Sequence, residues 1–167
     1  MLAGDNQIAN LESWASPSAW ALMLCNLYVR DGVAYVPTAA TTEAGYYLEI
    51  EPVEVAHLSD RIALKAAVMR AIERGHPRVP TPTRENFPKP IILKYAGVKA
   101  LRTFEKTASC WQFLMSNGLY QIEQWRPFPK GGWVPNGAKI ESLPASTSLD
   151  DAVDRFAERL CLGWPAA

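Results

Sequence analysis

The sequence predicts an α+β domain in which an antiparallel β-sheet built from hairpins has two main α-helices packed on it. Two tight-turn dipeptides, Asp31-Gly32 and Asn117-Gly118, each lie between β-prone runs. Two other segments place apolar residues at helical spacing, and the order strands, helix, strands, helix is typical of this fold class. Because 167 residues suffice for one sizeable core, we expect residues 1–167 to form a single globular domain.

Three segments carry the strand signals. Residues 22–36 are expected to form a hairpin, since Asp-Gly readily adopts the positive φ angles of a tight turn. Residues 45–57 alternate apolar and acidic side chains, which predicts a strand with one dry and one wet face, and Pro52 marks an edge or a bulge. Residues 110–125 form a second predicted hairpin.

Two helices are predicted from caps and apolar stripes. Ser59 is expected to cap the first, which Gly75 ends, and its buried side would carry Leu64, Val68 and Ile72. Ser148 is expected to cap the second, whose buried stripe would be Leu149, Val153, Phe156 and Leu160. A helical turn is predicted around 98–104.

The remaining segments are connections. Five prolines make 77–90 a stiff, extended crossing inside the domain. A short apolar strand is predicted at 91–95, and 126–143 is predicted to be an irregular loop with one short strand at 138–142. We expect residues 1–20 to be irregular.

The charges are sorted along the chain although they sum to zero. Residues 1–60 hold one basic residue, Arg30, against eight acids, whereas residues 61–106 hold eleven basic residues against three acids. This pattern indicates either two surfaces of opposite sign or segments that neutralise each other in the fold.

Motifs for chemistry are scarce. The histidines, His57 and His76, have no metal-ligand spacing, and no phosphate-binding loop or nucleophile elbow occurs. The three cysteines are widely spaced among apolar neighbours, which favours buried, inert thiols. With no apolar run near the ~20 residues of a membrane helix and no secretory signal, we expect a cytoplasmic protein without metal, cofactor or membrane contact.

Two alternatives remain open from the residues alone. The basic segment 61–106 could contact nucleic acid, in which case binding would depend steeply on salt. A small enzyme would instead need a pocket that encloses His57, His76 or Cys110 with a carboxylate in reach.

A resemblance extends over roughly residues 33–160. The chain resembles bacterial immunity proteins of contact-dependent growth inhibition and related polymorphic toxin systems in its run of hairpins, proline-rich crossing and late acidic helix. The segments that carry this likeness are 34–37, 45–52, 87–90, 94–98, 132–134 and 149–160.

The resemblance implies an antitoxin, not an enzyme, that binds the C-terminal domain of a toxin, often a nuclease, and blocks it without itself binding nucleic acid. Such proteins commonly present negative charge to a positive substrate groove. We therefore predict a toxin-binding face formed by Glu43, Glu49, Glu51 and Glu54. Trp133, in a proline-stiffened loop, is predicted to be a hydrophobic anchor on this face.

Overall fold

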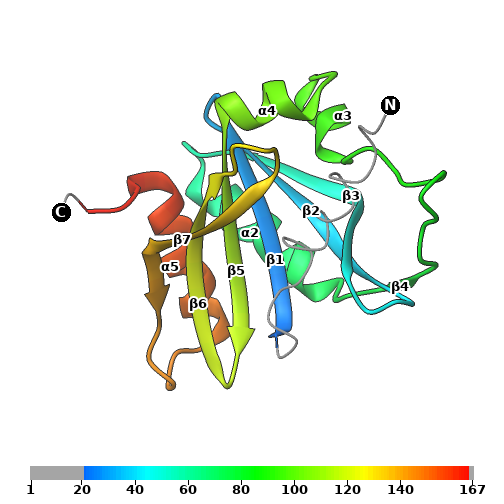
Figure 1. The fold of residues 1–167 in the computed structure, drawn as a ribbon. Coiled ribbons are helices and arrows are strands. Elements are labelled where there is room, and N and C mark those ends of the chain that lie inside the picture. The colour runs from blue at the N-terminus through cyan, green and yellow to red at the C-terminus, as the bar shows by residue number, and fades with distance from the viewer. Residues whose placement is uncertain (1–20, 166–167) are drawn as a thin grey trace.

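The computed structural model describes residues 21–165, which form a single α+β domain around one curved sheet (Figure 1). The strands are β1 (Ala21–Arg30), β2 (Val33–Thr42), β3 (Tyr47–His57), β4 (Arg78–Val79), β5 (Ala108–Ser116), β6 (Leu119–Pro127) and β7 (Trp133–Ser142). The helices are α2 (Arg61–Glu73), α3 (Ile92–Ala96), α4 (Leu101–Thr107) and α5 (Leu149–Leu162). The predicted irregular segment 1–20 lies outside the described residues.

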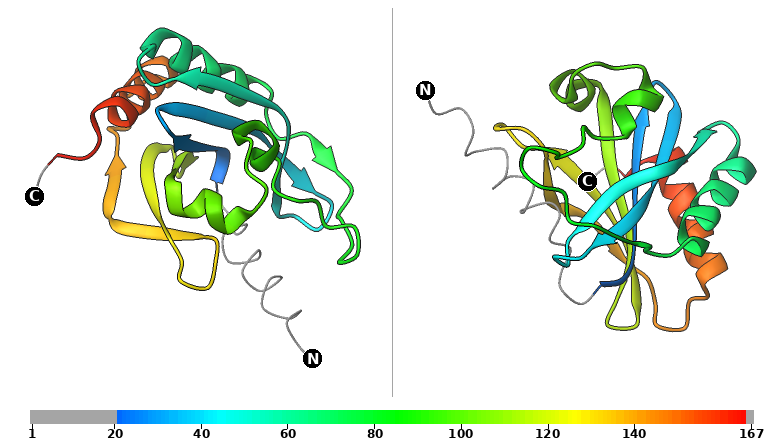
Figure 2. Two further views of the ribbon diagram at one scale, coloured as in Figure 1. Left: turned by 90° about the horizontal axis from the view of Figure 1, so that it is seen from above. Right: turned by 90° about the vertical axis from the view of Figure 1, so that its right-hand side faces the viewer.

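The sheet has the strand order β3-β2-β1-β5-β6-β7, and β4 adds to β2. All pairs are antiparallel except β2 with β4. Figure 2 shows that α2 and α5 cover the outer side of the curved sheet, whereas α3 and α4 lie against its inner side. The fold class predicted from the sequence is therefore confirmed.

Each face of the sheet has its own core. On the outer side, α2 and α5 bury a large cluster against the sheet that includes Leu27, Val36, Leu64, Phe113, Val153 and Phe156. On the inner side, a smaller cluster joins the strands to α3 and α4 and includes Tyr28, Tyr35, Ile92, Phe104, Trp125 and Trp133. Consecutive residues of β1, such as Leu27 and Tyr28, enter opposite cores because successive side chains of a strand point to opposite faces of the sheet.

Both predicted hairpin turns are present. Asp31 and Gly32 have φ angles of 51° and 74°, and Asn117 and Gly118 have φ angles of 53° and 75°. Two successive positive φ angles match the right-handed twist of the strands that they join. The turns therefore fix the registers of β1 with β2 and of β5 with β6.

Strand β3 lies at the edge of the sheet and is interrupted where Pro52 was predicted to mark an edge or a bulge. Pro37 of β2 lies opposite Val53, but the next residue, Thr38, lies opposite Ile50. Two residues of β3, Glu51 and Pro52, thus bulge out of the ladder. Proline is tolerated here because it has no N–H to donate.

The first hairpin opens away from its turn, and His76 fills the opening. Strands β1 and β2 pair from Tyr28 to Arg30, and farther along a histidine ring bridges them. The Leu24 N–H donates to Nε2 of His76 over 3.1 Å, and Nδ1 of His76 lies 2.7 Å from the Ala39 carbonyl oxygen. The imidazole therefore takes the place of a missing ladder bond, with its proton on Nδ1.

Helix α2 begins one residue later than predicted. Asp60, not Ser59, is the N-cap, because its Oδ1 accepts a hydrogen bond of 2.9 Å from the Ala63 N–H. The buried side carries Leu64 and Val68 as expected, and Gly75 with φ of 66° follows the helix. In α5, Ser148 is the predicted cap, and its Oγ accepts a 3.1 Å hydrogen bond from the Asp151 N–H.

Two predicted segments were wrong. Residues 91–95 were predicted to be a strand, but α3 begins at Ile92 and ends at Gly97 in the left-handed conformation. Residues 126–143 were predicted to be a mostly irregular loop, but β7 covers ten of them. Strand β7 bends where its register with β6 shifts, which accommodates its proline and glycine at the sheet edge.

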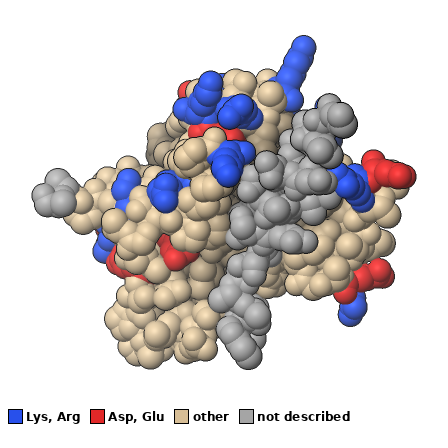
Figure 3. Space-filling view, viewed as in Figure 1, with Lys and Arg blue, Asp and Glu red and all other residues tan. Residues whose placement is uncertain are grey.

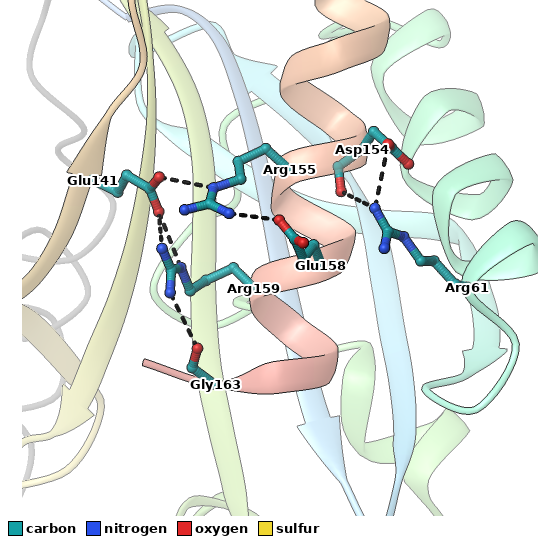
Figure 4. A network of polar contacts seen from close by, with 7 residues as sticks. All are labelled: Arg61, Glu141, Asp154, Arg155, Glu158, Arg159 and Gly163. Carbon is teal, nitrogen blue, oxygen red and sulfur yellow. Dashed lines mark hydrogen bonds and ion pairs between the residues drawn. The ribbon is translucent and has the colours of Figure 1, made fainter. Parts of the chain in front are cut away.

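A set of ion pairs joins α5 to its neighbours (Figure 4). Glu141 of β7 accepts hydrogen bonds from Arg155 and Arg159, with Nε distances of 2.8 and 3.0 Å. Arg159 also donates to the Gly163 carbonyl oxygen, and Arg61 of α2 reaches Asp154 over 3.2 Å. Charged residues on the helices thus pair with neighbouring elements.

Among the described residues, no helix is long and apolar enough to span a membrane.

Candidate docking surface

The four glutamates predicted to form one acidic face are distributed around β3. Glu49 points to the inner side of the sheet, where it meets β1, and Glu54 points to the outer side, where it meets α2. Glu51 lies in the bulge and pairs with α3, while Glu43 is exposed between β2 and β3. The structure therefore does not place these four carboxylates on a common face.

Glu54 is occupied by two arginines of α2. Its Oε2 accepts from Arg70 Nη2 over 2.8 Å, and its Oε1 accepts from Arg74 Nη1 over 2.7 Å. Hydrogen bonds from Arg70, and then from Arg74, lower the pKa of the Glu54 carboxyl, more than partial burial raises it. The side chain joins the edge strand to the helix and contributes little free negative charge.

Glu51 is paired at the surface. Its Oε1 accepts hydrogen bonds from Lys94 Nζ over 2.6 Å and from the Tyr95 hydroxyl over 3.2 Å. The bond from Lys94 and the charge of that ammonium lower the pKa of the carboxyl. The pair is largely exposed, so it is screened by salt and open to exchange with another partner.

Glu49 belongs to a polar network on the inner side of the sheet. Its Oε1 accepts from Asn26 Nδ2 over 2.9 Å and from the Tyr28 hydroxyl over 2.8 Å. The Asn26 Oδ1 in turn accepts from Gln112 Nε2 over 3.1 Å. Burial raises the pKa of the Glu49 carboxyl, and the two hydrogen bonds that it accepts oppose this rise.

Trp133 is buried rather than presented at the surface. Its side chain is 5% exposed and belongs to the inner core, with its ring centroid 6.3 Å from that of Tyr28. Trp125 lies in the same cluster and donates from Nε1 to Glu123 over 3.0 Å. An anchor role for Trp133 would require the β6–β7 turn to leave the core.

The candidate catalytic groups serve the fold. Both ring nitrogens of His76 face backbone groups of the sheet. Burial raises the pKa of the Cys110 thiol well above its usual value and that of Cys25 to about 12, so both thiols stay protonated and poorly nucleophilic at neutral pH. Cys161, predicted to be buried, is instead exposed, because it lies near the end of α5.

A group of basic residues gathers at the end of the molecule formed by α4 and the β6–β7 turn (Figure 3). Its exposed members, which we call the basic surface, are Lys99, Arg102, Lys106, Arg126 and Lys130. Within residues 21–165, none of the five has a carboxylate partner within ion-pair distance.

One buried contact brings the two parts of the basic surface together. Glu105 of α4, which is 6% exposed, accepts a hydrogen bond of 2.6 Å at Oε1 from the Gly132 N–H. Burial raises the pKa of the Glu105 carboxyl, while this bond and the Arg102 charge oppose the rise. Phe104 and Trp133 both belong to the inner core and both pack against Tyr28, so the surface rests on a packed support.

Three of these five residues belong to the basic segment 61–106 that is evident in the sequence, whereas Arg126 and Lys130 lie outside it. The structure also shows that the beginning of that segment is neutralised, because Arg70 and Arg74 pair with Glu54, and Lys65 pairs with Asp150. No signal in the sequence links residue 105 to residue 132. In the described part of the chain, no group of three or more His, Cys, Asp or Glu side chains is arranged to hold a metal ion.

Comparisons with known proteins show a shared fold. No protein-family model matches the sequence, and no curated protein matches it either. The structure is similar to a protein of unknown function, NMB0488, from Neisseria meningitidis, with a TM-score of 0.57, 16% identity and coverage of 84% of this chain and 93% of that chain. It is also similar to a chain in the structure of the CdiA-CT/CdiI toxin and immunity complex from Yersinia pseudotuberculosis, with a TM-score of 0.53 and 15% identity over 83% of this chain and 97% of that chain. The chain therefore has the fold of a component of a toxin–immunity complex.

Proposed function

We propose that this protein is the immunity protein of a contact-dependent growth inhibition system, which binds a toxin domain and neutralises it. The observation that carries the proposal is the fold shared with a chain of a toxin and immunity complex, over nearly the whole of that chain. The likeness between the sequence and immunity proteins of such systems supports the same role.

The side-chain chemistry supports the immunity role over the toxin role. The buried thiols of Cys25 and Cys110 are held protonated, and His76 is engaged by the backbone of β1 and β2. A toxin that acts as an enzyme needs reactive groups free to meet a substrate. The groups seen here stabilise the sheet, which suits a protein that acts by binding and is not itself an enzyme.

Coexpression tests the proposal directly. The toxin candidate is the C-terminal domain encoded by the gene immediately upstream, expressed alone and together with this protein in a bacterial host. We expect growth to stop with the toxin alone and to be rescued by coexpression, and a stable complex to be co-purified. We further propose that the toxin is a nuclease, as the resemblance to immunity proteins implies. The purified domain should then degrade nucleic acid, and this protein should stop the degradation at an equimolar ratio.

A control separates specific neutralisation from a general effect of expression. Phe156→Asp places a charge in the main core, where the wild-type ring is fully buried, so this variant should fail to fold and fail to rescue growth. Toxicity that persists with the folded wild-type protein, or rescue that occurs without a complex, would contradict the proposal.

One observation favours a second candidate function. The basic surface lacks carboxylate partners among the described residues, which is the electrostatic feature expected of a nucleic-acid-binding module. This candidate predicts binding to DNA or RNA that weakens steeply as salt is added.

A further inference from the structure

The basic surface carries exposed charge of the opposite sign to that predicted for the docking face. Glu51 and Glu54 are paired with bases of α2 and α3, and Glu49 accepts two hydrogen bonds from its neighbours. No carboxylate of the described residues lies within ion-pair distance of the five bases of the basic surface. A partner approaching this end of the molecule therefore meets a positive potential.

The basic surface is held in a fixed arrangement. Helix α4 carries Arg102 and Lys106 one turn apart, which places them on the same side. The Glu105 to Gly132 hydrogen bond ties the β6–β7 turn to this helix, and the turn is closed by a 2.8 Å bond from the Phe128 N–H to the Gly132 carbonyl oxygen. A surface set in advance loses little conformational entropy when a partner binds.

We propose that the toxin domain docks on this basic surface through an acidic patch of its own. This inference rests on the proposed function and specifies the chemistry of the partner's surface. Complementary charge speeds and orients the encounter of two proteins. It also implies that a nuclease toxin is contacted outside its positively charged substrate groove, since two positive surfaces repel each other.

The observations favour an acidic protein over a nucleic acid as the occupant. The whole chain has a formal charge of zero and a pI near 6.7, so its long-range attraction for a polyanion is small. Of the aromatic rings beside the basic surface, Phe104, Trp125 and Trp133 are buried and cannot stack on bases, which leaves the half-buried Phe128 of the β6–β7 turn. Helix α4 has seven residues, about 10 Å in length, which matches a compact protein patch better than an extended strand.

The test measures the affinity of a catalytically inactive form of the upstream-encoded toxin domain for three double variants by calorimetry. Arg102→Glu with Lys106→Glu reverses the basic surface, and we expect it to weaken binding on the order of tenfold or more and to slow association. Arg78→Glu with Lys89→Glu is the matched control, because both side chains are exposed in β4 and the proline-rich crossing, away from α4. Glu43→Lys with Glu51→Lys changes two of the acids predicted from the sequence to form the docking face. We expect this double variant and the Arg78 and Lys89 control to bind about as tightly as wild type.

The outcomes distinguish failure of this inference from failure of the proposed function. If the wild-type protein does not bind the toxin domain, the proposed function fails, and the inference fails with it. If the wild type binds but the Arg102 and Lys106 double variant binds equally well, the inference alone is overturned. Weakening by the Glu43 and Glu51 double variant instead would show that the docking face is acidic.

A second experiment tests whether nucleic acid, and not an acidic protein, binds the basic surface. A short fluorescent DNA duplex and the corresponding single strand are titrated with wild type and with the Arg102 and Lys106 double variant at low and high salt. We expect weak binding that does not survive physiological salt. Tight binding at physiological salt that is lost in the double variant would assign the basic surface to nucleic acid and overturn the inference. Circular dichroism spectra of all the variants serve as the control that each one is folded.

Discussion

The carboxylate of Glu105 accepts a 2.6 Å hydrogen bond from the backbone amide of Gly132, twenty-seven residues later in the chain. A buried side chain of α4 thereby fixes a tight turn between two strands. The same contact places Arg126 and Lys130 at the end of the molecule that α4 supplies with its own bases. This polar contact therefore joins the two parts of the basic surface, in addition to the packing of α4, β6 and β7 in the inner core.

Removing this acceptor should destabilise the protein. Glu105→Ala leaves the Gly132 N–H without its partner, and we expect a loss of about 1–3 kcal/mol in the free energy of unfolding, measured by urea denaturation. Glu105→Gln retains an acceptor oxygen and removes a buried charge, so it should keep most of the stability. Glu85→Ala, at an exposed site, serves as the control, and equal losses for alanine and glutamine at 105 would refute the role assigned to the bond.

The histidine between β1 and β2 provides a second test. His76→Phe keeps an aromatic ring beside Tyr47, whose centroid lies 4.8 Å from that of the imidazole, but removes both ring nitrogens. The Leu24 N–H and the Ala39 carbonyl then lose their partner, which should cost about 1–3 kcal/mol in unfolding free energy. The same change at the exposed His57 should be nearly neutral. Indistinguishable denaturation midpoints for the two variants would show that the ring does not complete the sheet.

Glu141 should matter more than Glu158 although both pair with Arg155. Glu141 also receives two hydrogen bonds from Arg159, whose side chain is only 12% exposed, so Glu141→Ala leaves a mostly buried guanidinium without its carboxylate. We expect a loss of about 1.5–3 kcal/mol, because hydrogen bonds to charged groups are the stronger class. Glu158→Ala breaks a pair within one helix and should cost no more than about 0.5 kcal/mol. Thermal denaturation of both variants measures the difference.

Acid should weaken the contact between β3 and α2. The pKa of Glu54 is lower in the folded protein than in the unfolded chain, so the unfolded state binds more protons as pH falls. The stabilisation that the Glu54 ion pairs give the folded protein is therefore complete above the pKa of Glu54 in the unfolded chain, about 4.3. It is lost as pH falls through the lower pKa of the folded protein. Glu54→Gln should flatten the fall of unfolding free energy below about pH 5, where the wild-type carboxylate begins to take up protons. A variant with the same acid slope as wild type would show that the pair contributes nothing measurable.

Local signals predicted the sheet better than the connections between its strands. Asp31-Gly32 and Asn117-Gly118 carry their turn geometry in their own backbone preferences, so both hairpins could be found from the sequence. The apolar run 91–95 suits a short strand as well as a buried helix, and packing of Ile92 and Leu93 into the inner core decides for the helix. The proline and glycines of 131–137 suggested a loop, but the edge of a sheet with a register shift tolerates them.

The candidate site was harder to predict because charge pairing is a property of the folded chain. Glu49 and Glu51 are two residues apart in β3, and Glu54 follows closely, which suggested one face. The bulge at Pro52 and the elements packed on either side of the strand instead send the three carboxylates to different partners. Likewise, α4, which carries Arg102, and the β6–β7 turn, which follows Arg126, come together only in the folded chain. Spacing within one strand or helix cannot reveal either relationship.

The pairing of acids on β3 with later bases also has an order in time, because a ribosome makes the N-terminal strands first. Glu51 and Glu54 therefore leave the ribosome before Arg70, Arg74 and Lys94, the bases with which they pair in the folded protein. During that interval the open edge of the nascent sheet carries unpaired negative charge, and neighbouring nascent chains on one messenger repel each other there. Because open strand edges are where unfinished sheets aggregate, this negative charge would protect the edge until α2 packs on the sheet and its arginines pair with Glu54.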